Sequence, residues 1–219
     1  MSELARYIDH TILKPTTTHI DINKICQETR EFGFAAACVP PPFVELARRS
    51  GVRVATVIGF PFGYSTLEAK AAEAVRALMD GADELDVVIN LIALKAGNWN
   101  LLETEMRTLT TVIHTAGKMV KVIIESGVLT EAEIIQCCTH YGGMGVDFVK
   151  TSTGYAEKGA TLEAVQLMRA HLPDSVKIKA SGGIRTAAFA RQLIDAGASR
   201  LGTSSGVALV EEEAMAGRY

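Results

Sequence analysis

The sequence lacks the patterns that mark membrane proteins and nucleic-acid-binding proteins. No apolar run approaches the roughly 20 residues of a membrane-spanning helix, and the first ten residues hold no basic region followed by an apolar stretch. Lysine and arginine form no block, and the formal net charge is only -3. We therefore expect a small-molecule partner, with no nucleic acid and no membrane.

Cysteine and histidine are scarce, and neither is arranged to bind a metal. The four cysteines show no Cys-x-x-Cys spacing, and two of them are adjacent, which makes a poor disulfide framework. The five histidines form no His-x-His or His-Glu-x-x-His cluster, although ligands distant in sequence could still converge. No Gly-x-Gly-x-x-Gly sequence or nucleotide P-loop is present. We predict a protein of the reducing cytoplasm that uses no metal and no cofactor.

The residues that are present describe a regular alternation along the chain. With 219 residues, 48% hydrophobic and 21% charged, the chain suits one soluble domain with a large core. Eight short apolar runs lie at residues 8–13, 34–40, 53–60, 84–91, 119–126, 147–153, 177–183 and 200–206. Segments with helical spacing lie between them, and four begin with a capping box or a close variant, at Thr18 to Asp21, Ser65 to Glu68, Asn100 to Glu103 and Thr130 to Glu133. Glycines stand where helices should stop, at Gly33, Gly51, Gly81, Gly117 and Gly197.

This alternation predicts the fold class. The apolar runs are continuous rather than alternating, as expected for parallel strands covered on both faces. Eight such strands with helices between them predict an α/β fold, a (β/α)8 TIM barrel, as a single domain over residues 1–219 with a mobile C-terminal tail. The length is near the short end for this fold, about 200 to over 400 residues, so a second domain has little room. An open doubly wound sheet is the main alternative.

Two lysines stand at the ends of apolar runs, Lys150 and Lys179, and an acid, Asp86, lies within a third run. Barrel enzymes place their chemistry at the carboxyl ends of the strands, where both lysines and Cys38 fall. An ammonium held in an apolar interior beside a second one loses its proton more easily and becomes a nucleophile. The pattern therefore predicts carbonyl chemistry through a Schiff base. A single lysine of this kind could instead extend into solvent, and Asp86 could be a buried hydrogen-bonding residue.

Two further lysines, Lys121 and Lys177, could also point inward. Lys177 has the same strand parity as Lys179, but it lies nearer the start of its strand. Lys121 carries the same ambiguity. We interpret both as structural.

A phosphate site is predicted in the last third of the chain. Two Gly-rich stretches, residues 181–186 and 202–206, follow the seventh and eighth expected strands, and loops at these places commonly bind phosphate in barrels. Glycine lets backbone N–H groups approach the anion, and the start of the next helix adds a favourable dipole. Either stretch alone could be an ordinary tight turn.

Five segments together resemble the deoxyribose-phosphate aldolase family in order and spacing. They are Asp9-His-Thr-Ile-Leu13, Cys38, Asp83-Glu-Leu-Asp-Val-Val-Ile-Asn90, Phe148-Val-Lys-Thr-Ser-Thr-Gly154 and Lys179-Ala-Ser-Gly-Gly-Ile-Arg-Thr186. The resemblance spans almost the whole chain, and its most specific part is Val-Lys-Thr-Ser-Thr-Gly with the later Lys and Gly-Gly-Ile-Arg. It implies reversible cleavage of 2-deoxy-D-ribose 5-phosphate to D-glyceraldehyde 3-phosphate and acetaldehyde, without a metal.

The resemblance also implies a role for each matching position. Lys150 resembles the Schiff-base lysine, Lys179 the second lysine that lowers its proton affinity, and Asp86 their partner in proton transfer. Thr153 is a candidate for orienting water or the iminium, while an ordinary strand-end threonine is structural. The remaining candidates are the phosphate-binding positions Gly154, Gly182, Gly183, Gly202, Ser204 and Ser205, with Arg185 nearby, and the further site residues Cys38 and Asp9. Cys38 could equally be a small buried hydrophobe.

Three positions at the edges of the match are less specific. Tyr155 stands where some relatives carry lysine, so phosphate contact there should rest on backbone amides and hydroxyls, and the preference for the phosphate could be weaker. Tyr219 resembles a terminal tyrosine of some members whose tail reaches the active site, whereas a disordered end is the ordinary alternative. His10 could touch substrate, but we interpret it as a hydrogen-bonded structural histidine.

Two other functions remain open from the sequence. Another Schiff-base aldolase or a transaldolase-like enzyme would keep the barrel and the phosphate site but act on a different phosphorylated sugar. A barrel that binds sugar phosphate without turnover is the non-enzyme alternative. The expected partners are sugar phosphates and aldehydes, and a homo-oligomer, dimer or tetramer, is compatible with either function.

Overall fold

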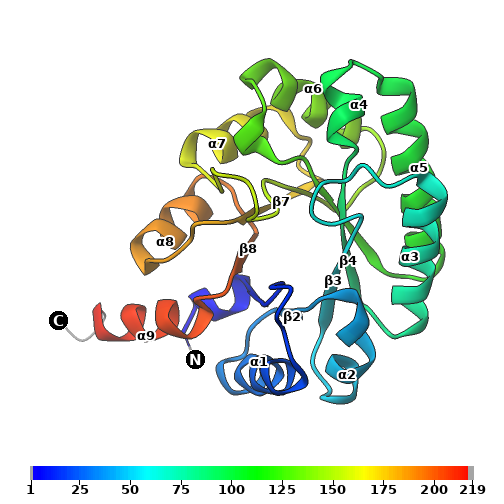
Figure 1. The fold of residues 1–219 in the computed structure, drawn as a ribbon. Helices are drawn as coiled ribbons and strands as arrows, with labels where there is room; N and C mark the ends of the chain where they lie inside the picture. The colour runs from blue at the N-terminus through cyan, green and yellow to red at the C-terminus, as the bar shows by residue number, and fades with distance from the viewer. Residues whose placement is uncertain (1, 217–219) are drawn as a thin grey trace.

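The computed structural model describes residues 2–216, and within them eight parallel strands form a closed barrel. Each strand pairs with its sequence neighbours, and β8 pairs with β1 to close the ring (Figure 1). The strands are β1 (Ile8–Thr11), β2 (Ala36–Cys38), β3 (Val54–Ile58), β4 (Glu84–Val88), β5 (Met119–Ile123), β6 (Phe148–Lys150), β7 (Lys177–Ser181) and β8 (Arg200–Thr203). The predicted (β/α)8 barrel is confirmed, and the β1–β8 pairing excludes an open sheet.

Helices surround the barrel on its outside (Figure 1). They are α1 (His19–Phe32), α2 (Val44–Arg49), α3 (Leu67–Met79), α4 (Leu91–Lys95), α5 (Trp99–Thr115), α6 (Glu131–Gly142), α7 (Leu162–His171), α8 (Ala187–Asp195) and α9 (Gly206–Ala216). Three short 3-10 turns are η1 (Leu4–Tyr7), η2 (Pro41–Phe43) and η3 (Ser126–Val128). Within residues 2–216, no helix combines the length and apolar character needed to cross a membrane.

The strands have two buried faces of different chemistry. Side chains that point outward, such as Leu85, Val87 and Ile178, join the large apolar core between barrel and helices. Side chains that point inward are separate from that core. Besides the charged residues they include Ala36, Cys38 and Ala55, which pack together, and further buried apolar side chains such as Val57, Val88 and Phe148. Because strand residues alternate between the two faces, one continuous buried run supplies side chains both to the barrel interior and to the core beneath the helices.

The predicted helix boundaries are confirmed at some places and wrong at others. Thr18 and Thr130 form the expected capping boxes with the residues three positions later. The start of α3 is capped by Thr66 instead of Ser65, and that of α5 by Asn98 instead of Asn100. In both cases another cap-type side chain, one or two residues away, accepts the backbone N–H of the third helical residue, so the sequence offered competing caps.

The five predicted stop glycines follow helices and adopt positive φ angles. These are Gly33, Gly51, Gly81, Gly117 and Gly197, with φ values of 70°, 75°, 100°, 68° and 113°. Glycine adopts this conformation without the steric penalty that a Cβ would bring, so each chain reversal is compatible with a short loop to the next strand.

Candidate active site

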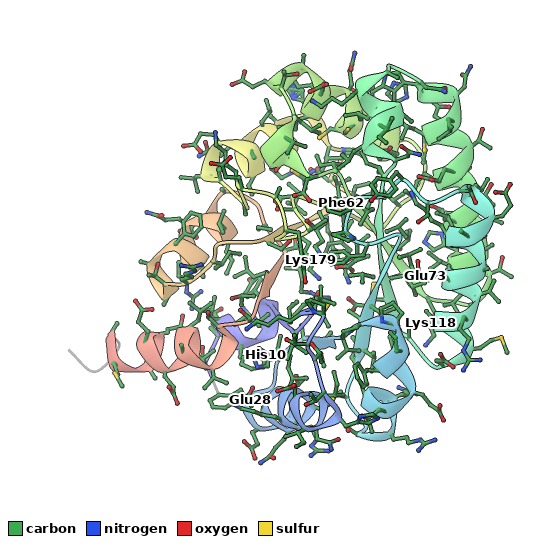
Figure 2. The ribbon with its side chains drawn as sticks, in the orientation of Figure 1. His10, Glu28, Phe62, Glu73, Lys118 and Lys179 are labelled. Carbon is green, nitrogen blue, oxygen red and sulfur yellow. The ribbon has the colours of Figure 1, made fainter. Side chains whose placement is uncertain are left out.

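Seven charged side chains meet inside the barrel. Figure 2 shows one of them, Lys179, near the centre of the ring. The strand register places their positions at similar heights, because Asp86 pairs with Lys121 and Lys150 pairs with Lys179. The seven are the acids Asp9, Glu84 and Asp86 and the cations Lys121, Lys150, Lys179 and Arg200, and ion pairs of 4 Å or less link them into one network.

Lys150 and Lys179 converge on a single carboxylate oxygen. Each Nζ lies 2.8 Å from Oδ2 of Asp86, and both side chains are buried. Lys179 also contacts Oδ2 of Asp9 at 2.5 Å. Two ammonium groups on one acceptor repel each other, so the site favours loss of one proton. Lys150 has the fewer acid contacts and lines the mouth of the barrel.

The pKa values of the two lysines move in opposite directions. Burial lowers the pKa of Lys150, and the charge of Lys179 adds to this, while Asp86 opposes it without reversing it. Burial acts to lower the pKa of Lys179 as well, but Asp86 and Asp9 outweigh it and the pKa is raised. Of the two, Lys150 is therefore the amine that becomes neutral at lower pH.

Charge balance leads to the same assignment. With every group ionised, the interior holds four cations and three anions. The net charge of the network is zero when Lys150 is neutral. Arg53 also approaches Glu84, at 3.3 Å, but its side chain is half exposed and solvent compensates its charge. Removal of one cationic proton thus relieves an uncompensated buried charge.

Glu84 and Arg200 are the part of the network that sequence analysis missed, and Lys121 was interpreted only as structural. Lys121 points inward and is fully buried, 2.6 Å from Asp86 and 2.7 Å from Glu84. Strand parity carried the signal, since Glu84 shares a face with Asp86. The exposed Lys177 shows the limit of that signal, because it has the parity of Lys179 yet lies at the strand start.

Above the charged network opens a pocket of about 590 Å³ at the carboxyl ends of the strands. It is lined by most of the predicted substrate positions, namely Lys150, Thr153, Gly154, Gly182, Gly183, Arg185, Gly202, Ser204 and Ser205. Asp9, Asp86 and Lys179 lie below its floor in the network. Cys38 is fully buried with Ala36 and Ala55, packed by Leu13, and so lies as a small hydrophobe beside the pocket.

The Gly-rich loops are shaped by close approach. A Cβ on Gly202 would lie 2.8 Å from Cβ of Ser181 and 3.1 Å from Cε of Lys179, so glycine leaves the space that Lys179 needs to reach the centre. Gly182 and Gly183 have φ values of 85° and 79°. This left-handed backbone is open to glycine, and glycine loops of this kind can present backbone N–H groups to an anion.

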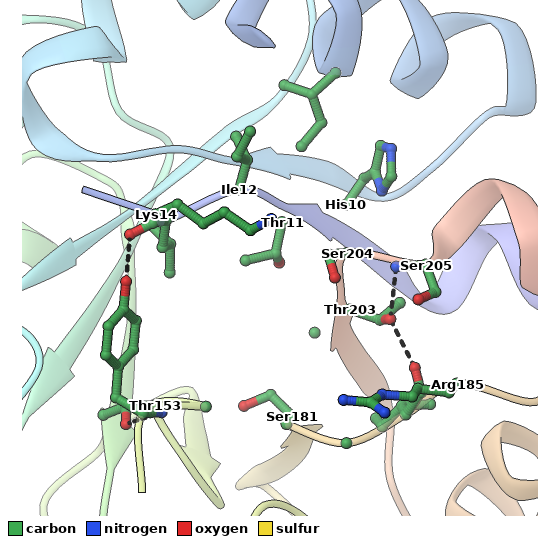
Figure 3. Close-up of a pocket in the computed structure, with 18 of the residues that line it drawn as sticks. His10, Thr11, Ile12, Lys14, Thr153, Ser181, Arg185, Thr203, Ser204 and Ser205 are labelled. Carbon is green, nitrogen blue, oxygen red and sulfur yellow. Dashed lines mark hydrogen bonds between the residues drawn. The ribbon is translucent and has the colours of Figure 1, made fainter. Parts of the chain in front are cut away.

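The loop before α9 is held by the hydroxyl of Thr203. This hydroxyl donates to the carbonyl oxygen of Ile184 at 2.9 Å and accepts from the N–H of Ser205 at 3.0 Å (Figure 3). The two phosphate-type loops are therefore joined by one side chain. Ser204 and Ser205 precede the first residue of α9, where the helix dipole favours an anion.

Tyr155 forms a bridge across the pocket mouth. Its hydroxyl donates to the carbonyl oxygen of Leu13 at 2.8 Å, and its ring meets Phe60 edge to face. The position thus offers an aromatic wall and no cation. Tyr219 lies outside the described residues.

His10 borders the pocket but its ring is engaged elsewhere. Nε2 lies 2.6 Å from Oε2 of Glu28 on α1, and the two side chains lie near each other in Figure 2. The residue is 4% exposed. This is the hydrogen-bonded arrangement expected of a structural histidine. In residues 2–216, no group of three or more His, Cys, Asp or Glu side chains is arranged to hold a metal ion.

Comparison with known proteins gives the same relationship from sequence and from structure. Residues 4–211 match the model of the DeoC/LacD family of aldolases. A deoxyribose-phosphate aldolase of Caldicellulosiruptor saccharolyticus is 47% identical over 216 residues, covering 96% of this chain and 98% of the relative. One of Thermococcus kodakarensis is 50% identical over 215 residues, covering 95% and 96%.

Two solved structures extend the comparison. A structure described as QR15, an aldolase, has a TM-score of 0.94 and 40% identity, with 100% of this chain and 99% of that chain covered. The tetrameric deoxyribose phosphate aldolase of Aeropyrum pernix has a TM-score of 0.89 and 34% identity, with 96% and 91% covered.

Proposed function

This chain belongs to the DeoC/LacD family of aldolases, and from that premise we propose that it cleaves 2-deoxy-D-ribose 5-phosphate reversibly to D-glyceraldehyde 3-phosphate and acetaldehyde. The observation that carries the proposal is the pair of buried lysines on one oxygen of Asp86, with the pKa of Lys150 lowered and that of Lys179 raised. A neutral amine beside a retained ammonium is what Schiff-base formation requires.

The reaction begins at Lys150. Its neutral Nζ attacks the C1 aldehyde, and the carbinolamine loses water to give an iminium. Removal of the C3 hydroxyl proton then lets the bond between C2 and C3 break, and its electron pair forms a neutral enamine while glyceraldehyde 3-phosphate leaves. Protonation at C2 and attack by water release acetaldehyde and restore the amine.

Proton transfer falls to Asp86 and Lys179. Their 2.8 Å contact supports a relay in which an ordered water carries the proton between this pair and the substrate. Asp9 and Lys121 support the relay from below, because each holds an opposite charge against one of its members. Asp86 and Lys179 therefore return to their ionised forms after each proton transfer.

The substrate phosphate is assigned to the loops after β7 and β8. Backbone N–H groups of Gly182 and Gly183, the hydroxyls of Ser204 and Ser205 and the start of α9 supply donors, and Arg185 borders the same pocket. Tyr155 adds no charge on the facing side. The enzyme should therefore discriminate against unphosphorylated deoxyribose less strongly than it would with a lysine in place of Tyr155.

Borohydride trapping tests the mechanism directly. Reduction in the presence of acetaldehyde, followed by peptide mapping, should give an ethyl adduct on Lys150 that is absent in Lys150→Ala. The exposed Lys177 provides a matched control, since Lys177→Ala should retain the adduct. An adduct on Lys179 instead would reverse the two lysine roles, and no specific adduct would exclude the Schiff-base reaction.

We also propose that the protein forms a homo-oligomer and that it works in the cytoplasm. A homo-oligomer is supported by the tetrameric relative and by an exposed apolar patch of Phe62, Tyr64 and Ile92. Phe62 and Tyr64 stack at 5.6 Å, and Gly63 between them lies against the carbonyl of Ile89, so the loop after β3 meets the segment that leads into α4. A reducing cytoplasm is supported by four free, buried cysteines.

A further inference from the structure

Glu125 is a buried acid near Lys150 that the reaction scheme leaves without a role. It follows β5 by two residues and is 3% exposed. Its backbone angles, φ 54° and ψ 57°, lie in the left-handed region. That conformation costs a residue with a Cβ on the order of 1 kcal/mol. Among residues 2–216 no other residue except glycine has a positive φ. The turn directs the carboxylate back toward the loop that follows Lys150.

The carboxylate holds Thr153 at two points. The backbone N–H of Thr153 donates to Oε1 at 3.2 Å and Oε2 at 3.3 Å, and its hydroxyl donates to Oε2. The same hydroxyl accepts the N–H of Tyr155 at 3.0 Å. A threonine hydroxyl has one proton and two lone pairs. The proton and one lone pair are committed, so a single lone pair remains for the pocket that Thr153 lines.

We propose that Glu125 is a positioning residue that sets the polarity of Thr153, so that Thr153 meets the substrate only as a hydrogen-bond acceptor. The inference rests on the proposed aldol reaction. Thr153 lies between Lys150, which forms a bond to C1 of the substrate, and Gly154, which lies beside the loop proposed to bind the phosphate. The substrate groups between those ends are the C3 and C4 hydroxyls. An acceptor there selects a hydroxyl that donates, which belongs to the glyceraldehyde phosphate half and not to acetaldehyde.

The charge of the reacting lysine supports this arrangement. Burial raises the pKa of Glu125, while the hydrogen bonds of Thr153 and the charge of Lys150 act against that rise. The iminium carries a positive charge at the same nitrogen, so the carboxylate is favoured in its ionised form while cleavage takes place. Hydrogen bonds to a charged acceptor are the stronger kind, which fixes the direction of the Thr153 proton.

Glu125→Gln reverses the polarity with almost no change in shape. The amide oxygen can still accept from the N–H of Thr153, but its NH2 group donates to the hydroxyl and turns the Thr153 proton into the pocket. We expect kcat/KM for cleavage of deoxyribose 5-phosphate to fall about ten- to hundredfold. Adduct formation with acetaldehyde at Lys150, measured with cyanoborohydride, should keep its wild-type rate. Glu157→Gln, an exposed acid in the same loop, should change neither rate.

A double-mutant cycle separates this role from general support of the fold. Thr153→Val should lower cleavage to a similar degree and spare adduct formation, and adding Glu125→Gln to it should cause no further loss. Equal loss of both reactions in either variant would overturn the proposal, and so would additive losses. If Glu125→Gln does not fold, Thr153→Val alone carries the comparison. A wild-type protein that forms no acetaldehyde adduct would instead refute the aldolase function on which the inference rests.

Discussion

At the scale of single residues, the proposed chemistry rests on the different ion-pair partners of two similar lysines. Lys179 contacts two carboxylates and Lys150 contacts one, so the same burial leaves one amine charged and the other easily neutralised. The sequence predicted Lys150, Lys179 and Asp86 as a group because each is a charged side chain within an apolar run. Which lysine is nucleophilic depends on the contacts, which strand order alone does not give.

Removing the charge of Lys179 should shift the pH dependence of Schiff-base formation. In Lys179→Met one cause of the lowered pKa of Lys150 is lost, and Asp86 is left to stabilise the Lys150 ammonium more strongly. The pKa of Lys150 should rise, so the neutral amine appears only at higher pH. The rate of cyanoborohydride-trapped adduct formation with acetaldehyde, followed against pH, should have its rising limb at higher pH than in wild type. Lys177→Met should leave the limb in place, and a downward shift would contradict the assignment.

Lys121 should matter for stability, because it is buried in the middle of β5. Lys121→Met would remove the one cation that lies 2.6–2.7 Å from both Glu84 and Asp86 in a fully buried site, and the remaining cations lie farther from each acid. Breaking a buried pair by removing one partner costs about 3–5 kcal/mol in the free energy of unfolding. Urea denaturation monitored by circular dichroism would measure it. The exposed Lys177→Met should change stability by about 0.5 kcal/mol or less, and equal effects of the two variants would refute a structural role for the buried cation.

At the scale of elements, the sequence predicted some helix starts and misplaced others by one or two residues. Thr18 and Thr130 begin their helices as expected. Thr66 and Asn98 took the place of Ser65 and Asn100, which are equally good caps by residue type. The choice between adjacent caps depends on where the preceding loop leaves the strand, which is a tertiary property.

The capping box of α6 offers a local test of this account. Thr130→Ala removes the oxygen that accepts the N–H of Glu133 and the hydroxyl that donates to Oε2 of Glu133, while the backbone N–H of residue 130 can still donate to that carboxylate, so the free energy of unfolding should fall by about 1 kcal/mol. Thr139→Ala, in the exposed interior of the same helix, should be neutral or slightly stabilising because alanine is the better helix former. Thermal unfolding of both variants gives the comparison. A larger loss of stability in Thr139→Ala than in Thr130→Ala would contradict a stabilising role for the capping box.

At the scale of the whole molecule, the barrel brings together residues far apart in sequence. Lys179 meets Asp9 across 170 positions, and Arg200 meets Asp9 across 191. Closure between β1 and β8 makes these contacts, since an open sheet would separate the first strand from the last. These charged contacts of the candidate site therefore depend on the closure of the barrel.

Association of copies can be tested at the apolar patch of Phe62, Tyr64 and Ile92. We expect the wild-type protein to sediment as a dimer or larger species, and Phe62→Asp to shift it toward the monomer because a charge would be buried at the contact. Met215→Asp on α9, an exposed apolar side chain away from the patch, should leave sedimentation unchanged. A monomeric wild-type protein would remove the proposal of self-association.

The sequence by itself determined the strands, the helices and the barrel, because apolar periodicity and the placement of glycines are local properties of the chain. It also singled out the two lysines, because a charged residue is conspicuous within an apolar run. Only the tertiary structure decided the rest. Lys121, Glu84 and Arg200 joined the site because strand register brings side chains of neighbouring strands to one height. The unequal pKa values of the lysines and the hold of Glu125 on Thr153 likewise depend on distances between separate strands and loops. Electrostatic energy falls with distance and rises with burial, and neither quantity is fixed until the chain has folded.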